Sequence, residues 1–143
     1  ESLPTKRVLS SYAFEDTCWE YLDKMRVLCR EKGVELVLIK APSLYPYWYE
    51  EYDTQIRTYA GQHGLKFYNF TESIEDIGLD FSTDTYDGGL HLNLDGATKM
   101  SAWFARILAE EPGLADHRED PQVAERYREK LALYDEEAMG ESE

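Results

Sequence analysis

A histidine that follows two aspartates is the part of this sequence best suited to chemistry. Asp84 and Asp87 precede His91 by seven and four residues, and the glycines at 88 and 89 allow the backbone to fold back so that a carboxylate meets the imidazole. A histidine that acts as a general base needs a carboxylate to fix its tautomer and to stabilise the imidazolium. The spacing indicates such a base, with Asp87 or Asp84 orienting it. The plain alternative is a loop histidine bonded to a neighbouring carboxylate.

A second polar group follows the first expected strand. In an open α/β sheet ligands bind beyond the carboxyl ends of the strands, which is where Lys40 and Ser43 emerge. Lys40 could bind an anionic substrate, although a lysine at a strand end more often extends into solvent. Ser43 could serve as a nucleophile, but Pro42 and the following helix favour a turn or cap role, and no nucleophile-elbow glycines flank it.

Aromatic residues are concentrated between positions 45 and 52. Trp48 and Tyr52 match a helical apolar stripe and are expected in the core. Tyr45, Tyr47 and Tyr49 fall off that stripe. They could line a cleft for a sugar or acyl group, or form ordinary surface or an oligomer contact.

A metal site is the other chemistry that this loop could carry. Asp84, Asp87, His91 and Asp95 are hard or borderline ligands close together in the sequence. They lack the rigid helical or Cys/His spacing of known sites. We therefore expect no metal and no other cofactor.

Hydrophobic periodicity predicts alternating helices and strands around these residues. A continuous aliphatic run after the first helix is typical of a strand buried in a parallel sheet. The expected elements are a helix over 12–32, a strand over 34–39, a helix over 48–60 closed by His63-Gly64, a strand over 66–70, a long loop over 71–94 with one helical turn near 73–77, a helix over 97–108, a helix over 120–134 with Asp120 as N-cap, and a fraying acidic tail over 135–143.

The first helix has an apolar stripe and clear end signals. Ser11 is its expected N-cap and Gly33 its C′ residue, and the stripe consists of Phe14, Cys18, Leu22, Met25 and Cys29. Eleven residues of helix separate the cysteines by about 16 Å, which is too far for a disulfide. Two free, buried thiols mildly favour a reducing compartment, so a cytoplasmic location is slightly favoured.

Two strands are too few for a parallel sheet with helices on both faces. Residues 6–10 could add a strand, a second copy could pair across an edge, or an N-terminal half could supply the rest. The opening without methionine suggests that the natural protein starts elsewhere.

Bulk composition limits the partners. At 143 residues and 43% hydrophobic content, the sequence predicts a single α/β domain over 1–143. A net charge of −14 argues against nucleic acid and anionic membrane surfaces. The sequence contains no apolar run long enough to span a bilayer and no signal-type core near its start.

The histidine segment also resembles a known family. Asp87-Gly88-Gly89-Leu90-His91-Leu92-Asn93, with Gly96-Ala97 after it, is similar to the final motif block of the SGNH/GDSL hydrolase superfamily, especially its DltD-like bacterial members. Residues 35–42 resemble the penultimate strand of those proteins and 66–70 the last, so the resemblance covers about residues 20–110. It implies a flavodoxin-like three-layer α/β/α fold, of which this chain holds an incomplete sheet.

The resemblance implies that His91 is the general base and that a nearby aspartate orients it. The family spacing is commonly Asp-x-x-His, which would place the acid at Gly88, so Asp87 requires one more residue in the turn and Asp84 is the fallback. The family's nucleophilic Ser and its oxyanion donors, a Gly and an Asn, belong to earlier blocks that are not visible here.

The chain is expected to be the C-terminal portion of a serine esterase or acyltransferase that acts on an O-acyl ester, such as that of a carbohydrate or cell-envelope polymer. On its own such a chain should be nearly inactive. The expected substrate contacts are Asn93, Lys40, Ser43, Tyr45 and Tyr47. The alternative is a non-catalytic SGNH-derived module that binds a glycan or a protein.

Overall fold

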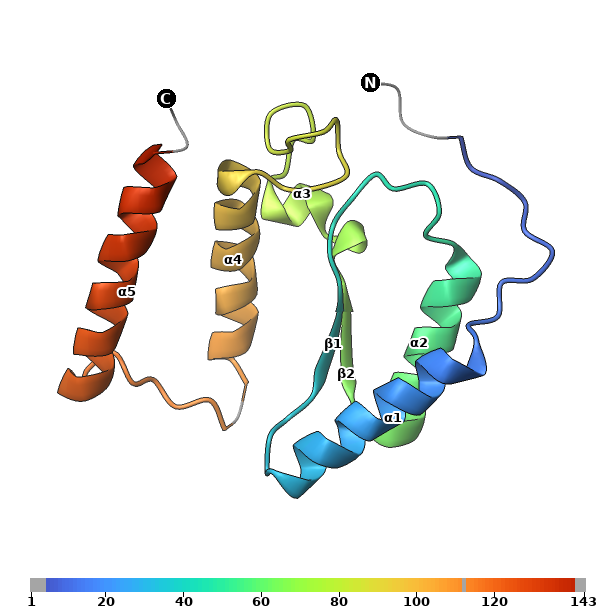
Figure 1. Cartoon of the computed structure of the whole chain (residues 1–143), viewed down its shortest axis with the longest axis horizontal. Coiled ribbons are helices and arrows are strands. Elements are labelled where there is room, and N and C mark those ends of the chain that lie inside the picture. Colours follow the sequence, from blue (N-terminus) through green and yellow to red (C-terminus); the bar gives the residue numbers. More distant parts are fainter. Residues whose placement is uncertain (1–4, 112, 141–143) are drawn as a thin grey trace.

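A computed structural model describes residues 5–111 and 113–140, and these residues form a mixed α/β chain with five helices and a small two-stranded parallel sheet (Figure 1). The predicted alternation of helix and strand is confirmed. In chain order the elements are α1 (Asp16–Glu31), β1 (Val37–Lys40), α2 (Glu50–His63), β2 (Lys66–Asn69), the 3₁₀ turn η1 (Phe70–Glu72), α3 (Ile74–Ile77), α4 (Leu94–Ala109) and α5 (Pro121–Gly140).

Helices lie on both faces of the β1–β2 sheet. Successive side chains of a strand point to opposite faces, and β2 follows this rule. Asn69 donates a 2.7 Å hydrogen bond to Asp53 of α2, whereas the ring of Tyr68 lies edge-on to Phe104 of α4, with centroids 5.8 Å apart. The carboxyl ends of both strands lie at the edge of the sheet nearest the loop before α4 (Figure 1).

The first helix begins four residues later than predicted. The side chain of Gln55 accepts from the Phe14 amide at 3.1 Å and donates to the Tyr12 carbonyl at 2.8 Å. These backbone groups are thus bound to α2 and do not start a helix at Ser11. The end of α1 is as predicted, with Gly33 in the left-handed region at φ 65°.

The predicted apolar face of α1 is not buried. Cys18 and Met25 are exposed, and no residue of α1 is buried. The prediction of two buried thiols is therefore wrong: both cysteines are free, and only Cys29 is half-buried. The helix instead contacts α2 through its other side, where the Trp19 ring stacks on Tyr59 with centroids 5.3 Å apart.

Residues 6–10 do not form the third strand that the sequence allowed. The carbonyl of Arg7 accepts a 2.6 Å hydrogen bond from the Tyr49 hydroxyl, and the Leu9 amide donates to the Tyr12 hydroxyl at 3.2 Å. The backbone here is held by tyrosine side chains and not by a sheet. Within the described residues, β1 is therefore paired only with β2.

The aromatic segment is arranged differently from the prediction. Tyr49, which the sequence left as either a cleft residue or a surface or oligomer contact, is buried at the start of α2, with the rings of Tyr12 and Tyr52 at centroid distances of 4.9 and 5.3 Å. Trp48 and Tyr52, expected in the core, are half-buried. The buried apolar residues are Tyr49, Tyr59, Ala60, Phe70 and Ile77.

The last helix has the predicted start but not the predicted end. One oxygen of Asp120 accepts from the amides of Gln122 and Val123 at 2.9 and 3.2 Å, the N-cap arrangement that the Asp-Pro pair indicated. The helix then continues to Gly140, so residues 135–140 of the expected fraying tail are helical. No helix in the described part of the chain is long and apolar enough to span a bilayer.

Candidate functional site

The Asp87–His91 pair has the geometry of an oriented base. Nδ1 of His91 lies 2.6 Å from one carboxylate oxygen of Asp87. The other oxygen of Asp87 accepts from the amides of Leu90 and His91 at 3.0 and 2.8 Å. These bonds fix the carboxylate and lower the pKa of Asp87, with the imidazole as the largest cause. The imidazole side chain is 79% exposed, so its edge is open to a reactant.

A short hairpin-like turn holds this pair above the carboxyl end of the sheet. Thr85 and Leu92 form an isolated antiparallel bridge, and the Tyr86 amide donates to the His91 carbonyl at 3.1 Å. Between them Gly88 and Gly89 take φ values of 70° and 111°, where side chains are disfavoured. The two glycines thus supply the fold-back that the sequence predicted.

Asp84 supports the loop and does not contact His91. Its side chain is buried, and both oxygens accept from Nζ of Lys99 on α4, at 2.9 and 2.7 Å. One oxygen also accepts from the Asp80 amide at 2.8 Å. The hydrogen bond with Lys99 is the main reason why the pKa of Asp84 is lowered. Asp87 is therefore the aspartate that meets the imidazole, and Asp84 ties the loop to α4.

Asn93 caps α4. Its side-chain oxygen accepts from the Gly96 amide at 3.0 Å, its Nδ2 donates to the Thr83 carbonyl at 2.7 Å, and its own amide donates to the Asp84 carbonyl at 3.0 Å. Gly96 is buried against Asp84, so closely that a Cβ there would overlap the Asp84 carbonyl oxygen. Asn93 and Gly96 of the predicted motif therefore stabilise the junction between the loop and α4.

The loop after β1 contacts the histidine turn directly. The Leu44 amide donates to the Gly89 carbonyl at 2.7 Å, and a Cβ at Gly89 would come within 2.6 Å of the Leu44 side chain. No local pattern predicts this contact, because the two residues are far apart in the chain. The structure therefore brings together the two loops that were predicted to carry site residues.

Lys40 and Ser43 interact with each other on the loop after β1. Nζ of Lys40 donates to the Ala41 carbonyl at 2.5 Å and to Oγ of Ser43 at 3.3 Å, and it lies 5.4 Å from the centre of the Trp48 ring. Partial burial lowers the pKa of Lys40. No carboxylate of the described residues lies within ion-pair distance of this lysine. The head of Lys40 is thus held by the Ala41 carbonyl, the Ser43 hydroxyl and the Trp48 ring.

Tyr45 and Tyr47 form an exposed to half-buried aromatic pair on the same loop after β1. Their ring centroids are 5.0 Å apart, in an edge-to-face arrangement. The Ser43 hydroxyl accepts weakly from the Tyr45 amide at 3.4 Å, as a turn residue would. The pair is thus presented on the same loop that touches the histidine turn.

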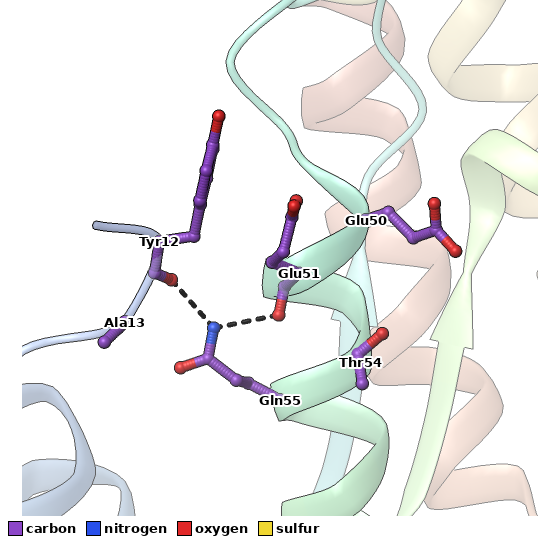
Figure 2. Close-up of a pocket in the computed structure, with 6 residues that line it drawn as sticks. All are labelled: Tyr12, Ala13, Glu50, Glu51, Thr54 and Gln55. Carbon is purple, nitrogen blue, oxygen red and sulfur yellow. Dashed lines mark hydrogen bonds between the residues drawn. The ribbon is translucent and has the colours of Figure 1, made fainter. Parts of the chain in front are cut away.

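A separate cavity of about 440 Å³ lies at the start of α2 (Figure 2). Glu50, Glu51 and Gln55 are among its lining residues, and Nε2 of Gln55 donates to the carbonyls of Tyr12 and Glu51 (Figure 2). Neither Asp87 nor His91 lines it. It marks the junction between the N-terminal segment and α2, away from the oriented histidine.

The described residues include no group of side chains placed to bind a metal ion. Within residues 5–111 and 113–140, no three His, Cys, Asp or Glu side chains are grouped to hold an ion. Asp84, the most buried carboxylate of the predicted set, is already bound to Lys99.

No protein-family model matches this chain, and neither the curated proteins nor the solved structures contain a significant match to it.

Proposed function

We propose that this chain is the base-supplying portion of an SGNH-type serine esterase or acyltransferase with a flavodoxin-like three-layer α/β/α fold. The observation that carries the proposal is the 2.6 Å contact between His91 Nδ1 and an Asp87 carboxylate that two backbone amides hold in place. The resemblance of residues 87–97 to the last SGNH motif block supports the same assignment. The extra residue between acid and base is accommodated by Gly88 and Gly89.

The chemistry follows from the acceptor that Nδ1 faces. An ionised Asp87 accepts a hydrogen from Nδ1, which leaves the lone pair on Nε2 of the neutral imidazole. A serine hydroxyl placed against Nε2 gives up its proton as its oxygen attacks the acyl carbonyl, and Asp87 stabilises the imidazolium. The imidazolium then protonates the departing alcohol. Water or an acceptor hydroxyl repeats the sequence to release the acyl group.

The nucleophile in this proposal comes from outside the described residues. Ser43 is the local candidate, but its hydroxyl faces Lys40 Nζ and the Tyr45 amide, which suits a turn residue. The described loop also supplies no glycine-flanked serine of the elbow type. Without the serine and the oxyanion donors, the chain alone lacks a large catalytic contribution and should be nearly inactive.

The loop after β1 supports an O-acyl carbohydrate as substrate. The tyrosine pair offers aromatic faces of the kind that stack on sugar rings, and Lys40 offers a cation for an anionic polymer. The hydrogen bond between Leu44 and Gly89 keeps this loop beside His91. Asn93 is better explained as a helix cap than as a substrate contact, because its side chain is engaged at both ends.

The test is hydrolysis of p-nitrophenyl acetate by the protein that contains this chain together with the nucleophile. His91→Ala should lower kcat by roughly 10²–10⁴-fold, the usual contribution of a general base. His117→Ala, on the exposed loop before α5, is the matched control and should leave the rate unchanged. Unchanged activity of His91→Ala would reject the proposed base. The binding-module alternative is favoured if no ester is hydrolysed while acetylated polysaccharide is still retained through Tyr45 and Tyr47.

A further inference from the structure

Two cavities adjoin along one side of α2. The first is the cavity of about 440 Å³ between residues 12–13 and the first two turns of the helix (Figure 2). The second, of about 290 Å³, lies between α1 and the later turns of α2. Thr54 and Gln55 line both cavities, so together they form one groove, which we call the α2 groove. The lining of the second cavity consists of Trp19, Thr54, Gln55, Thr58, Tyr59 and Gln62.

Hydrogen bonds hold the two sides of the α2 groove together. The side chain of Gln55 accepts from the Phe14 amide at 3.1 Å and donates to the Tyr12 carbonyl at 2.8 Å. Further along the helix, the hydroxyl of the buried Tyr59 donates to Asp23 of α1 at 2.7 Å. These bonds join α2 to the segment before α1 and to α1 itself without any ligand. The groove is therefore largely preformed, as ligand sites usually are.

Aromatic rings line both halves of the α2 groove. Tyr12 lines the first cavity, and Trp19 and Tyr59 line the second. The Trp19 ring stacks on Tyr59, with centroids 5.3 Å apart and planes at 26°. Tyr12 and Trp19 are only half-buried. Their rings thus offer flat apolar surface to a ligand in the groove.

A row of polar side chains borders these rings. Glu50, Thr54, Thr58 and Gln62 follow one another at intervals of four residues on α2, so they lie on one side of the helix, and all four are exposed. The Thr58 hydroxyl donates to the Thr54 carbonyl at 2.7 Å, and its oxygen can still accept. The Thr54 hydroxyl and the Gln62 amide each offer both a donor and an acceptor.

The charges around the α2 groove favour an uncharged ligand. Of the described residues that line the two cavities, none is a lysine or an arginine, and the net charge of −14 repels anions. Glu50 and Glu51 lie in the first turn of α2, where the helix dipole stabilises carboxylates without a cationic partner. Carboxylates also accept hydrogen bonds from hydroxyl groups. A neutral ligand rich in hydroxyls therefore matches both the rings and the polar row.

We propose that the α2 groove binds a neutral oligosaccharide, whose ring faces pack on the aromatic side chains and whose hydroxyls bond to Thr54 and Gln62. From Glu50 to Gln62 the helix rises by about 18 Å, which is long enough for several linked sugar rings. His91 lines neither cavity, so the groove is separate from the proposed base. Retention of a polymeric ester substrate through this groove rests on the proposed function, whereas sugar binding itself does not.

The experiment is an NMR titration of the isotope-labelled chain with three neutral sugars: cellotetraose, maltotetraose and tetra-N-acetylchitotetraose. We expect at least one sugar to shift the signals of Trp19, Thr54 and Gln62, with a Kd of about 1 mM for an open groove with few hydrogen bonds. Thr54→Val and Gln62→Ala should each weaken binding about fivefold, the usual contribution of one hydrogen bond. Gln122→Ala is the matched control for Gln62→Ala, because Gln122 is also exposed but lies on α5.

The outcomes separate this groove from other sites. The substituted positions are exposed, so circular dichroism should show that the variants remain folded. An absence of shifts with all three sugars, at their highest soluble concentrations, overturns the proposal. Shifts confined to Tyr45 and Tyr47 also overturn it, because they place the sugar on the loop after β1. Groove shifts caused only by a lysine-rich peptide reject it in favour of a cationic partner. His91→Ala should leave sugar binding unchanged, so a failure of the groove and a failure of the proposed base are read separately.

Discussion

The carboxylate of Asp87 determines which nitrogen of His91 carries the hydrogen. Because its oxygen lies 2.6 Å from Nδ1, we expect the neutral ring to be the Nδ1–H tautomer. Long-range ¹⁵N–¹H NMR spectra of the chain should show this form as dominant. Asp87→Asn should shift the population towards Nε2–H, and Asp84→Asn should not. A wild-type ring that is already mostly Nε2–H would contradict the orientation proposed for the base.

The ion pair between the buried Asp84 and the more exposed Lys99 should make stability depend on pH. The folded-state pKa of Asp84 is lowered, so its contribution is complete above the unfolded value of about 3.9 and is lost as pH falls through the folded value. Urea unfolding from pH 5 to pH 2.5 should therefore show a steeper loss of unfolding free energy for the wild type than for Asp84→Asn. Asp95→Asn serves as the control and should follow the wild type, because Asp95 is exposed on α4, the helix that carries Lys99. Parallel curves for wild type and Asp84→Asn would rule out this contribution.

At this scale the sequence identified the residues whose partners are local. Asp87 and His91 lie four residues apart, so the pair and the turn between them could be predicted from residue types alone. Lys99 could not, because its partnership with Asp84 depends on how α4 docks on the loop. The same limit explains why Asp84 remained an alternative and why Asn93 was assigned to the substrate.

The junction between the histidine loop and α4 tolerates no side chain at Gly96. A Cβ would overlap the Asp84 carbonyl oxygen, so Gly96→Ala should lower the unfolding free energy by about 1–3 kcal/mol, as overpacked sites do. Gly61→Ala offers the opposite case within α2, where nothing lies within 4 Å of the added carbon. Helix propensity predicts a gain of up to about 1 kcal/mol there. Urea denaturation of both variants tests the pair, and equal effects would refute the packing argument.

Elements were predictable where their signals are internal. Glycines at the ends of α1 and α2 and the Asp-Pro start of α5 fix those ends through backbone conformation and capping. The start of α1 was mispredicted because Gln55, some 40 residues away, binds the backbone that would otherwise begin the helix. Periodicity also indicated an apolar face on α1 but could not show that Cys18 and Met25 on that face are exposed.

For the whole molecule, the open surface should reduce the heat capacity change of unfolding. A compact domain of this length would give roughly 1.7–2.1 kcal/mol/K, because unfolding exposes its buried apolar area. This chain already exposes much of that area on α1, β1 and α5, so differential scanning calorimetry should give a value below about 1.7 kcal/mol/K. A value within the compact range would mean that the exposed apolar residues of α1, β1 and α5 are covered in solution.

The hydrogen bond from Leu44 to Gly89 joins the aromatic loop to the histidine turn. Ordering of one loop is thereby coupled to ordering of the other, and thermodynamic linkage makes that coupling reciprocal. A sugar that settles on Tyr45 and Tyr47 would steady His91, and an acyl group held at His91 would tighten the tyrosine loop by the same free energy. Binding of the polymer and ordering of the base would then depend on the same conformational equilibrium.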